Sequence, residues 1–136
     1  MRTRPITPPA PRRDSEFVAH LVEVFHAFGP IQARRMFGGH GIYHAGLMIG
    51  LVADDVLYLK ADDATLPAFR AAGCTPFEYV KNGKAMKMSY LSAPASIFDD
   101  PQQAREWAAL AYGAAQRSRL TAKPRRQQLG VRWRLR

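Results

Sequence analysis

Residues 77–91 read FEYVKNGKAMKMSYL and contain the clearest turn signal in the chain. Asn82-Gly83 is the dipeptide most typical of a two-residue β-hairpin turn, because both positions of that turn need a positive φ. A two-residue turn fixes the register of the two strands, with apolar pairs on one side and an opposite-charge pair on the other. The expected pairs are Tyr79 with Met86 and Phe77 with Met88 on the apolar side, and Glu78 with Lys87 and Val80 with Ala85 on the other. The sequence therefore predicts an antiparallel hairpin here.

Three more strands are predicted upstream, where the pattern of apolar residues changes from helical spacing to that of strands. They are expected around residues 36–43, over residues 47–52 and over residues 56–60. Short turns at residues 44–46 and at Asp54-Asp55 would join them as an antiparallel meander.

Three helices are predicted, each beginning at a residue with a short oxygen-bearing side chain, the type preferred at a helix N-cap. The expected spans are residues 14–28, starting at Asp14 or Ser15, residues 62–73, starting at Asp62 or Asp63, and residues 101–117, starting after Asp100. Gly29-Pro30 and Gly73 end the first two. In the third helix, Gln103 is placed for a capping box, and small alanines share one face with Trp107.

The order of the elements is helix, three strands, helix, two strands, helix. Helices that pack on one face of an antiparallel sheet form a two-layer α+β domain. We therefore expect a five-stranded antiparallel sheet with helices, in the order α-β-β-β-α-β-β-α. A chain of 136 residues suits one such domain.

The excess positive charge of the chain is confined to its ends. The formal net charge is +9, from 20 Lys and Arg against 11 Asp and Glu. Residues 1–13 carry +4 and residues 117–136 carry +8, both without an acid, which leaves −3 for residues 14–116. We therefore expect a disordered, basic, proline-rich leader over residues 1–13, a folded domain over residues 14–117 and a basic tail over residues 118–136.

The composition excludes several classes of protein. Hydrophobic residues make up 47% of the chain and charged residues 23%, which is typical of a globular domain. No apolar stretch approaches the roughly 18–20 residues that cross a bilayer. A single cysteine, Cys74, excludes an internal disulfide, and we expect a protein of the reducing cytoplasm. The favoured role of Cys74 is that of a small, partly buried side chain, because no base can be assigned to it as a nucleophile.

An ordered series of motifs runs along the predicted domain. The motifs are residues 35–43 (RMFGGHGIY), 50–52 (GLV), 57–60 (LYLK), 76–79 (PFEY) and 88–90 (MSY), with Lys84 and the helix that bears Trp107. Taken together, they resemble the N-terminal domain of the TfoX/Sxy family, bacterial proteins named for regulating natural competence. The resemblance covers about residues 15–117 and implies an α+β fold with the order of elements given above.

The resemblance also implies a function. Full-length relatives carry a second, helical domain after this one and act as transcriptional co-regulators, through protein contacts rather than catalysis. The basic tail follows the third helix here, so we expect a stand-alone N-terminal domain. It would be a non-enzymatic regulatory or protein-interaction module in transcriptional regulation, with a protein partner, no cofactor and no metal, and it is compatible with a homodimer. The alternative is a nucleic-acid-binding accessory protein that acts through its basic ends.

The run Gly38-Gly39-His40-Gly41 allows two interpretations. It lacks the Lys-Ser/Thr of a phosphate-binding P-loop and does not lead from a strand into a helix. The structural interpretation is a β-bulge or a place where another backbone passes closely, and the other is a small-ligand site. A metal site at His40 and His44 is disfavoured, since no Cys, Asp or Glu pair nearby completes a ligand set.

Basic residues inside the predicted domain are candidates for contact with an anionic ligand or an acidic partner surface. Their alternative role is ordinary solvated charge at strand ends. Together with the glycine run and a tyrosine they form the candidate contact set: Arg35, Gly38, Gly39, His40, Lys60, Lys84 and Tyr90. The aspartate pairs at residues 54–55, 62–63 and 99–100 are assigned to turns and helix starts.

The tail combines arginines with a tryptophan, a composition that suits phosphate contact and stacking on an unpaired base. The candidate nucleic-acid contacts are Arg119, Lys123, Arg125, Arg126, Arg132, Trp133 and Arg134. A solubilising disordered end is the other interpretation of the tail.

Overall fold

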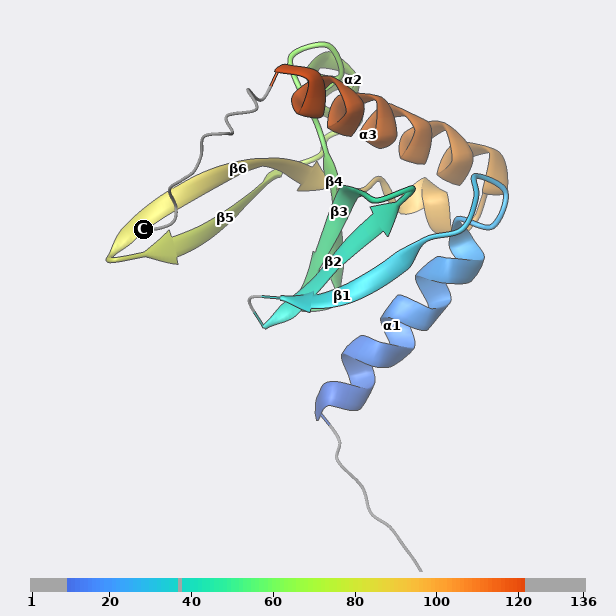
Figure 1. The fold of residues 1–136 in the computed structure, drawn as a ribbon, viewed down its shortest axis with the longest axis horizontal. Helices are drawn as coiled ribbons and strands as arrows, with labels where there is room; N and C mark the ends of the chain where they lie inside the picture. The colour runs from blue at the N-terminus through green and yellow to red at the C-terminus, as the bar shows by residue number, and fades with distance from the viewer. Residues whose placement is uncertain (1–9, 37, 122–136) are drawn as a thin grey trace, which may run out of the picture.

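A computed structural model describes the backbone of residues 10–36 and 38–121, together with their side chains except those of residues 10–15, 79–81 and 85–88. Within this part, helices and strands combine in one α+β fold with an antiparallel sheet, which confirms the predicted class (Figure 1). The sheet has six strands where the sequence predicted five, and they lie in the order β1-β2-β3-β4-β6-β5.

The additional strand lies before the first predicted strand, which was expected to begin around residue 36. β1 (Gln32–Met36) and β2 (Gly39–His44) are antiparallel neighbours, and Gly38 lies between them with φ +76°. β1 has the sequence QARRM, and its first four residues are exposed. It therefore has no apolar alternation of its own, which is the signal that strand prediction needs.

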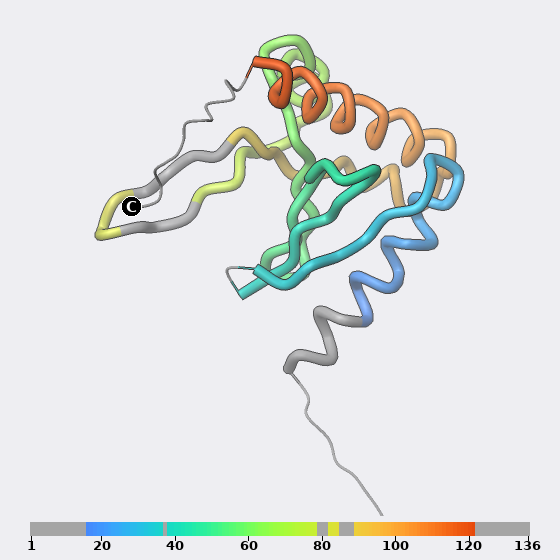
Figure 2. Tube along the Cα trace, in the orientation of Figure 1, coloured from blue at the N-terminus to red at the C-terminus, as the bar shows by residue number. Residues whose placement is uncertain are grey.

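The remaining strands follow the predicted segments closely. They are β3 (Leu47–Ala53), β4 (Val56–Lys60), β5 (Pro76–Lys81) and β6 (Lys84–Ser92). β3 and β4 meet at Asp54-Asp55, whose positive φ values of +52° and +61° suit the two-residue turn that the sequence predicted. Figure 2 follows the chain through these hairpins and shows β6 crossing back to lie between β4 and β5.

The predicted register of the last hairpin is confirmed for three of its four pairs. Tyr79 pairs with Met86, Glu78 with Lys87 and Val80 with Ala85. The pair of Phe77 with Met88 is wrong, because the register shifts between Pro76 and Glu78 and brings Pro76 opposite Leu91. At this end β6 also pairs with β4, and Phe77 packs on Tyr58 of β4, with 4.8 Å between the ring centroids.

The first helix is displaced toward the N-terminus relative to its prediction. α1 (Ala10–Val24) begins at a proline-containing first turn, for which proline is well suited. It ends before Phe25, and the chain continues in single turns, in which the amide groups of Phe28 and Gly29 donate to the carbonyl of Phe25 at 2.9 and 3.0 Å. The remainder of the predicted leader, residues 1–9, lies outside the described residues.

The other two helices differ from their predictions at their ends. α2 (Leu66–Ala71) starts later than expected, because side-chain bonds of Asp62 and Thr65 hold the preceding residues in a turn. A short 3-10 helix, η1 (Ala95–Phe98), precedes α3 (Pro101–Thr121).

Asp100 begins α3 as predicted, but the predicted capping box is wrong. The Asp100 carboxylate accepts the amide of Gln102 at 2.9 Å. The Asp100 amide donates to the carbonyl of Ser96 at 3.0 Å, so it is already paired. The side chain of Gln103 instead accepts a bond from Trp107 Nε1 at 3.3 Å.

The helices cover one face of the sheet. All three contribute to one buried cluster with side chains from the central strands. Its members include Leu21 and Phe25 of α1, Phe69 of α2, Ala104, Ala108, Ala111 and Ala115 of α3, and Ile42, Val52, Leu57, Leu59 and Leu91 of the strands. The four alanines recur at helical spacing and share one face of α3, as predicted, and their small side chains let the helix pack closely on β3 and β4.

Candidate functional site

The opposite face of the sheet carries a second group of side chains, which we call the open face. Residues paired directly across antiparallel strands share a face. Arg34 pairs with Gly41, Gly41 with Leu51, and Leu51 with Tyr58, so these four residues lie on the same face. Lys60 pairs with Tyr90. The larger members of the open face are Arg34, Met36, Tyr43, Met48, Leu51, Tyr58, Lys60, Phe77 and Tyr90. The same register adds Gln32, Ala53, Val56 and Ser92.

Part of the open face is shielded from water although the helices lie on the other side. Leu51 and Tyr90 are only 8% and 7% exposed, yet neither belongs to the core cluster. Tyr43, Tyr58 and Phe77 are half-buried. Figure 1 shows the β5–β6 hairpin extending away from the helices, so the sheet is not a flat layer. The open face is therefore an aromatic surface separate from the core.

Two cations lie over tyrosine rings of the open face. The Arg34 guanidinium is 4.8 Å from the centroid of the Tyr43 ring, and Lys60 Nζ is 5.1 Å from that of Tyr90. Lys60 Nζ also donates a hydrogen bond to Ser89 Oγ at 2.8 Å. Such contacts hold each cation in position over an aromatic ring of the surface.

Burial changes the acidity of two groups here. Partial burial lowers the pKa of Lys60, an effect that the nearby Asp62 carboxylate opposes. Burial, and secondarily the neighbouring Tyr43, raises the pKa of Tyr90 to about 12. Tyr43 of β2 and Tyr90 of β6 are separated in the sheet by β3 and β4, and the strand register places both on the open face. Tyr90 remains a neutral phenol at physiological pH.

The glycine run has the structural role that the sequence favoured. A Cβ added at Gly39 would lie 2.0 Å from the carbonyl oxygen of Val52, so only glycine lets β2 approach β3 this closely. A Cβ at Gly41 would lie 2.6 Å from Met36 Sδ on the open face. The register of β2 and β3 shifts between Ile42 and Tyr43, so the irregularity lies just after the glycine run, where the bulge was predicted, and not within it. The glycine run therefore lets β1, β2 and β3 pack closely against one another.

The two histidines of this region occupy different environments. His40 is 8% exposed, and its Nδ1 has no hydrogen-bond partner among the described residues. His44 Nδ1 is 2.8 Å from the carbonyl oxygen of Pro30, and its ring packs on Phe28 and Tyr112. Within the residues that the structure describes, no group of three or more His, Cys, Asp or Glu side chains is placed to hold a metal ion.

The predicted contact set divides into two groups. Lys60 and Tyr90 are brought together on the open face, as described above. Arg35 and His40 are opposite each other in β1 and β2, next to the glycine turn. Lys84 is exposed at the start of β6. Sequence reasoning counted Arg34 among the basic candidates but left it out of the candidate contact set, and it did not single out Tyr43 or Ser89 as contacts. The alternation of Tyr58 with Lys60 was a usable signal for this face.

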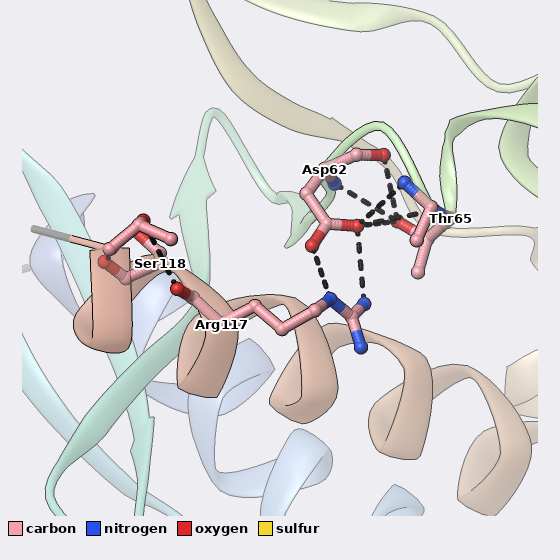
Figure 3. Close-up of polar contacts among 6 residues, drawn as sticks. Asp62, Thr65, Arg117 and Ser118 are labelled. Atoms are coloured by element: carbon pink, nitrogen blue, oxygen red, sulfur yellow. Dashed lines mark hydrogen bonds and ion pairs between the residues drawn. The ribbon is translucent and has the colours of Figure 1, made fainter.

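A salt bridge joins the end of α3 to the turn before α2 (Figure 3). Arg117 Nε donates to Asp62 Oδ2 at 2.6 Å and Arg117 Nη2 to Asp62 Oδ1 at 3.2 Å. Asp62 Oδ1 also accepts the amides of Ala64 and Thr65 at 3.1 and 3.2 Å. Asp62 therefore stabilises a turn, as predicted, and its carboxylate also binds Arg117 at the end of α3.

The hydrogen bonds from Arg117 are the largest cause that lowers the pKa of Asp62. Burial opposes them, and the amides of Thr65 and Ala64 lower the pKa further. Since the folded-state pKa of Asp62 lies below its unfolded value, the salt bridge between Asp62 and Arg117 stabilises the fold above the unfolded pKa. That stabilisation is lost as the pH falls through the folded pKa.

A cleft of about 550 Å³ connects this salt bridge to the open face. It is lined by Lys60, Asp62, Ser89, Arg117 and Thr121, among others. The last described residue of α3, Thr121, and Lys60 therefore line the same cleft.

Cys74 is half-buried, in accordance with its predicted role. Burial raises the pKa of its thiol, which keeps it in the less nucleophilic protonated form. It lines a second cleft of about 390 Å³ with Leu66, Arg70 and Leu91.

Among the predicted nucleic-acid contacts, Arg119 is exposed in the last turn of α3. Lys123, Arg125, Arg126, Arg132, Trp133 and Arg134 lie outside the described residues. No helix in the described ranges combines the length and the apolar character needed to cross a membrane.

Comparison with known proteins identifies the family. The family model of the TfoX N-terminal domain matches residues 23–115. The chain is 31% identical over 100 residues to the DNA transformation protein TfoX1 of Aliivibrio fischeri, a match that covers 65% of this chain and 48% of that relative. The chain thus spans about half the length of this relative. Because the family model matches well over half of its residues, the chain belongs to the family of the TfoX N-terminal domain.

Proposed function

We propose that this chain is a non-enzymatic regulatory module of DNA transformation that acts in the cytoplasm by binding a protein partner. The observation that carries the proposal is the open face. The similarity to a protein named for DNA transformation supports a role in that process. We propose that the module acts there through transcriptional regulation.

The composition of the open face is that of a protein interface. Aromatic residues, methionine and arginine are enriched in the centres of such interfaces, whereas aspartate and glutamate are depleted. Tyrosine and arginine are also frequent among the residues that contribute most to binding. The open face contains three tyrosines, two methionines, a phenylalanine and an arginine, and its members include no carboxylate.

The polar groups near the open face have structural partners, which favours binding over catalysis. Lys60 is bonded to Ser89, and Asp62 is engaged by Arg117 and by two backbone amides. A general base or nucleophile needs to reach a substrate with a free lone pair. These groups instead fix the shape of the surface.

Replacing both Tyr43 and Tyr58 by alanine in the native host is expected to lower transformation frequency at least tenfold. Both rings are half-buried on the open face, so their loss removes contact area while the core remains intact. Transformation frequency and the transcripts of DNA-uptake genes are the measurements. Leu120→Ala, at a side chain 82% exposed on α3, is the matched control and is expected to have no effect.

Circular dichroism of the purified double variant checks that it is folded. A folded double variant that supports normal transformation and normal transcript levels would contradict the proposal.

A second candidate function is nucleic-acid binding through the chain ends, which the acid-free charges of +4 and +8 favour. If the tail neutralises ~4–6 phosphates, log K falls with log salt at a slope of roughly −4 to −5. DNA and RNA are titrated at two or more salt concentrations, with the intact chain and with residues 1–13 and 122–136 removed. Affinity of the intact chain that does not depend on salt would exclude this function.

A further inference from the structure

The open face ends at a strand edge. β1 is an outer strand of the sheet, and within the described residues it pairs only with β2. Its residues 32–35 are exposed. The outer backbone amides and carbonyls of such a strand can form a ladder with an added extended segment.

Two arginines mark both sides of this edge. Arg34 belongs to the open face, and Arg35, the next residue along the strand, points to the other side of the sheet. Neither guanidinium forms an ion pair with a carboxylate of the described residues. An extended segment laid along β1 would therefore meet one guanidinium on each of its two faces.

These arginines decide between two possible occupants. A second copy pairing antiparallel through β1 would bring arginines of the two copies close together, and like charges across strands are destabilising. Charged side chains on an edge strand are a common protection against such self-association. A segment with carboxylates on both faces would meet opposite charges instead.

A nucleic-acid strand is also less well suited to this edge. Base stacking needs free aromatic faces, but Arg34 and Lys60 already lie over the rings of Tyr43 and Tyr90, and Tyr90 is buried. A phosphodiester backbone cannot continue the hydrogen-bond ladder of β1. An acidic protein segment uses both the cations and the ladder.

We propose that β1 accepts an acidic, extended segment of a protein partner as an added strand, with carboxylates bound to Arg34 and Arg35. This inference rests on the proposed function, because it names the chemistry of the partner at the border of the open face. The side chains of the segment that lie over the sheet would continue onto Met36 and Tyr43.

The test measures fluorescence anisotropy of a labelled peptide of alternating glutamate and valine, about eight residues long, on the full chain. Arg34→Glu with Arg35→Glu is expected to weaken its binding at least tenfold, since two attractions become repulsions. Arg105→Glu makes a matched change at an exposed residue of α3 and is expected to alter affinity less than twofold. Arg34→Lys with Arg35→Lys keeps both charges and is expected to retain most of the binding.

A peptide of the same sequence with alternate backbone amides methylated separates strand addition from simple charge attraction. It carries the same charge, so it would still bind the basic ends of the chain, but it cannot complete the ladder. We expect it to bind at least tenfold more weakly than the unmethylated peptide.

Several outcomes would overturn the inference. The first is that the methylated peptide binds as tightly as the unmethylated one, and the second is that the Arg105 and Arg34/Arg35 reversals weaken binding equally. The third is a dimer in sedimentation that depends on Arg34 and Arg35. The fourth is that a single-stranded oligonucleotide, but not the peptide, binds through these arginines. If the peptide fails while the Tyr43/Tyr58 double variant still impairs transformation, only the partner chemistry is wrong and the proposed function stands.

Discussion

Gly39→Ala is expected to lower the free energy of unfolding by about 3 kcal/mol or more. The new methyl group would lie 2.0 Å from the carbonyl oxygen and 3.2 Å from the carbonyl carbon of Val52. Both atoms belong to the backbone of β3, which is held by its pairing with β2 and β4, so they cannot move aside as a flexible side chain would. The pairing of β2 with β3 must open instead. Urea denaturation followed by circular dichroism measures the loss.

The neighbouring glycine provides the matched control. A Cβ at Gly38 would meet nothing within 4 Å, but the residue has φ +76°. Gly38→Ala therefore pays only the cost of a left-handed conformation, about 1 kcal/mol. Equal losses in the two variants would show that backbone conformation, rather than close approach of β2 and β3, explains the need for glycine.

Phe69→Ala is expected to lower the free energy of unfolding by about 3–5 kcal/mol. Phe69 is 0% exposed, and its ring lies edge-on to Trp107 of α3 with 4.9 Å between the centroids. It is also the buried residue of α2, a helix of six residues. A helix this short has little stability of its own, so losing its anchor releases the whole element from the core.

The comparison for this variant is Phe98→Ala, which removes the same ring at a site 38% exposed. We expect it to cost less than Phe69→Ala, since more than a third of the Phe98 side chain is already in contact with water. Urea midpoints and the near-ultraviolet signal of Trp107 follow both variants. A loss below about 1 kcal/mol for Phe69→Ala would mean that α2 does not depend on this ring.

The parts of the fold that were predicted correctly are those specified by local signals. Asn82-Gly83 and Asp54-Asp55 each determine a two-residue turn through their own positive φ values, and the strand pairs beside them follow from counting. The spacing of alanines likewise determined which face of α3 is buried. In these cases the information lies within a few residues of the structure that it specifies.

The parts that were missed depend on partners far away in the chain. β1 is a strand because β2 pairs with it, and its own exposed residues give no alternation. The shift at Phe77 arises because β6 must pair with β4 as well as with β5. The capping box failed because Ser96, four residues upstream, had already taken the Asp100 amide. Local propensity cannot anticipate such competition.

The candidate site shows the same division. Lys60 and Tyr90 were both singled out, but only the pairing of β4 with β6 places one over the other. Arg34 carries no sequence signal that distinguishes it from Arg35, because the two differ only in which face of β1 they occupy. The close packing of Gly39, by contrast, was anticipated from composition alone.

The separation of aromatic residues between the core and the open face has a practical consequence. Of the five tyrosines, Tyr43, Tyr58 and Tyr90 are on the open face, whereas Trp107 contacts Phe69 of the core. Tyr112, by contrast, packs against the core. With Trp133 and Tyr112 replaced by phenylalanine, tryptophan emission would report on unfolding. A change in tyrosine absorbance at constant tryptophan emission would then report a binding event in the folded protein, without an attached dye.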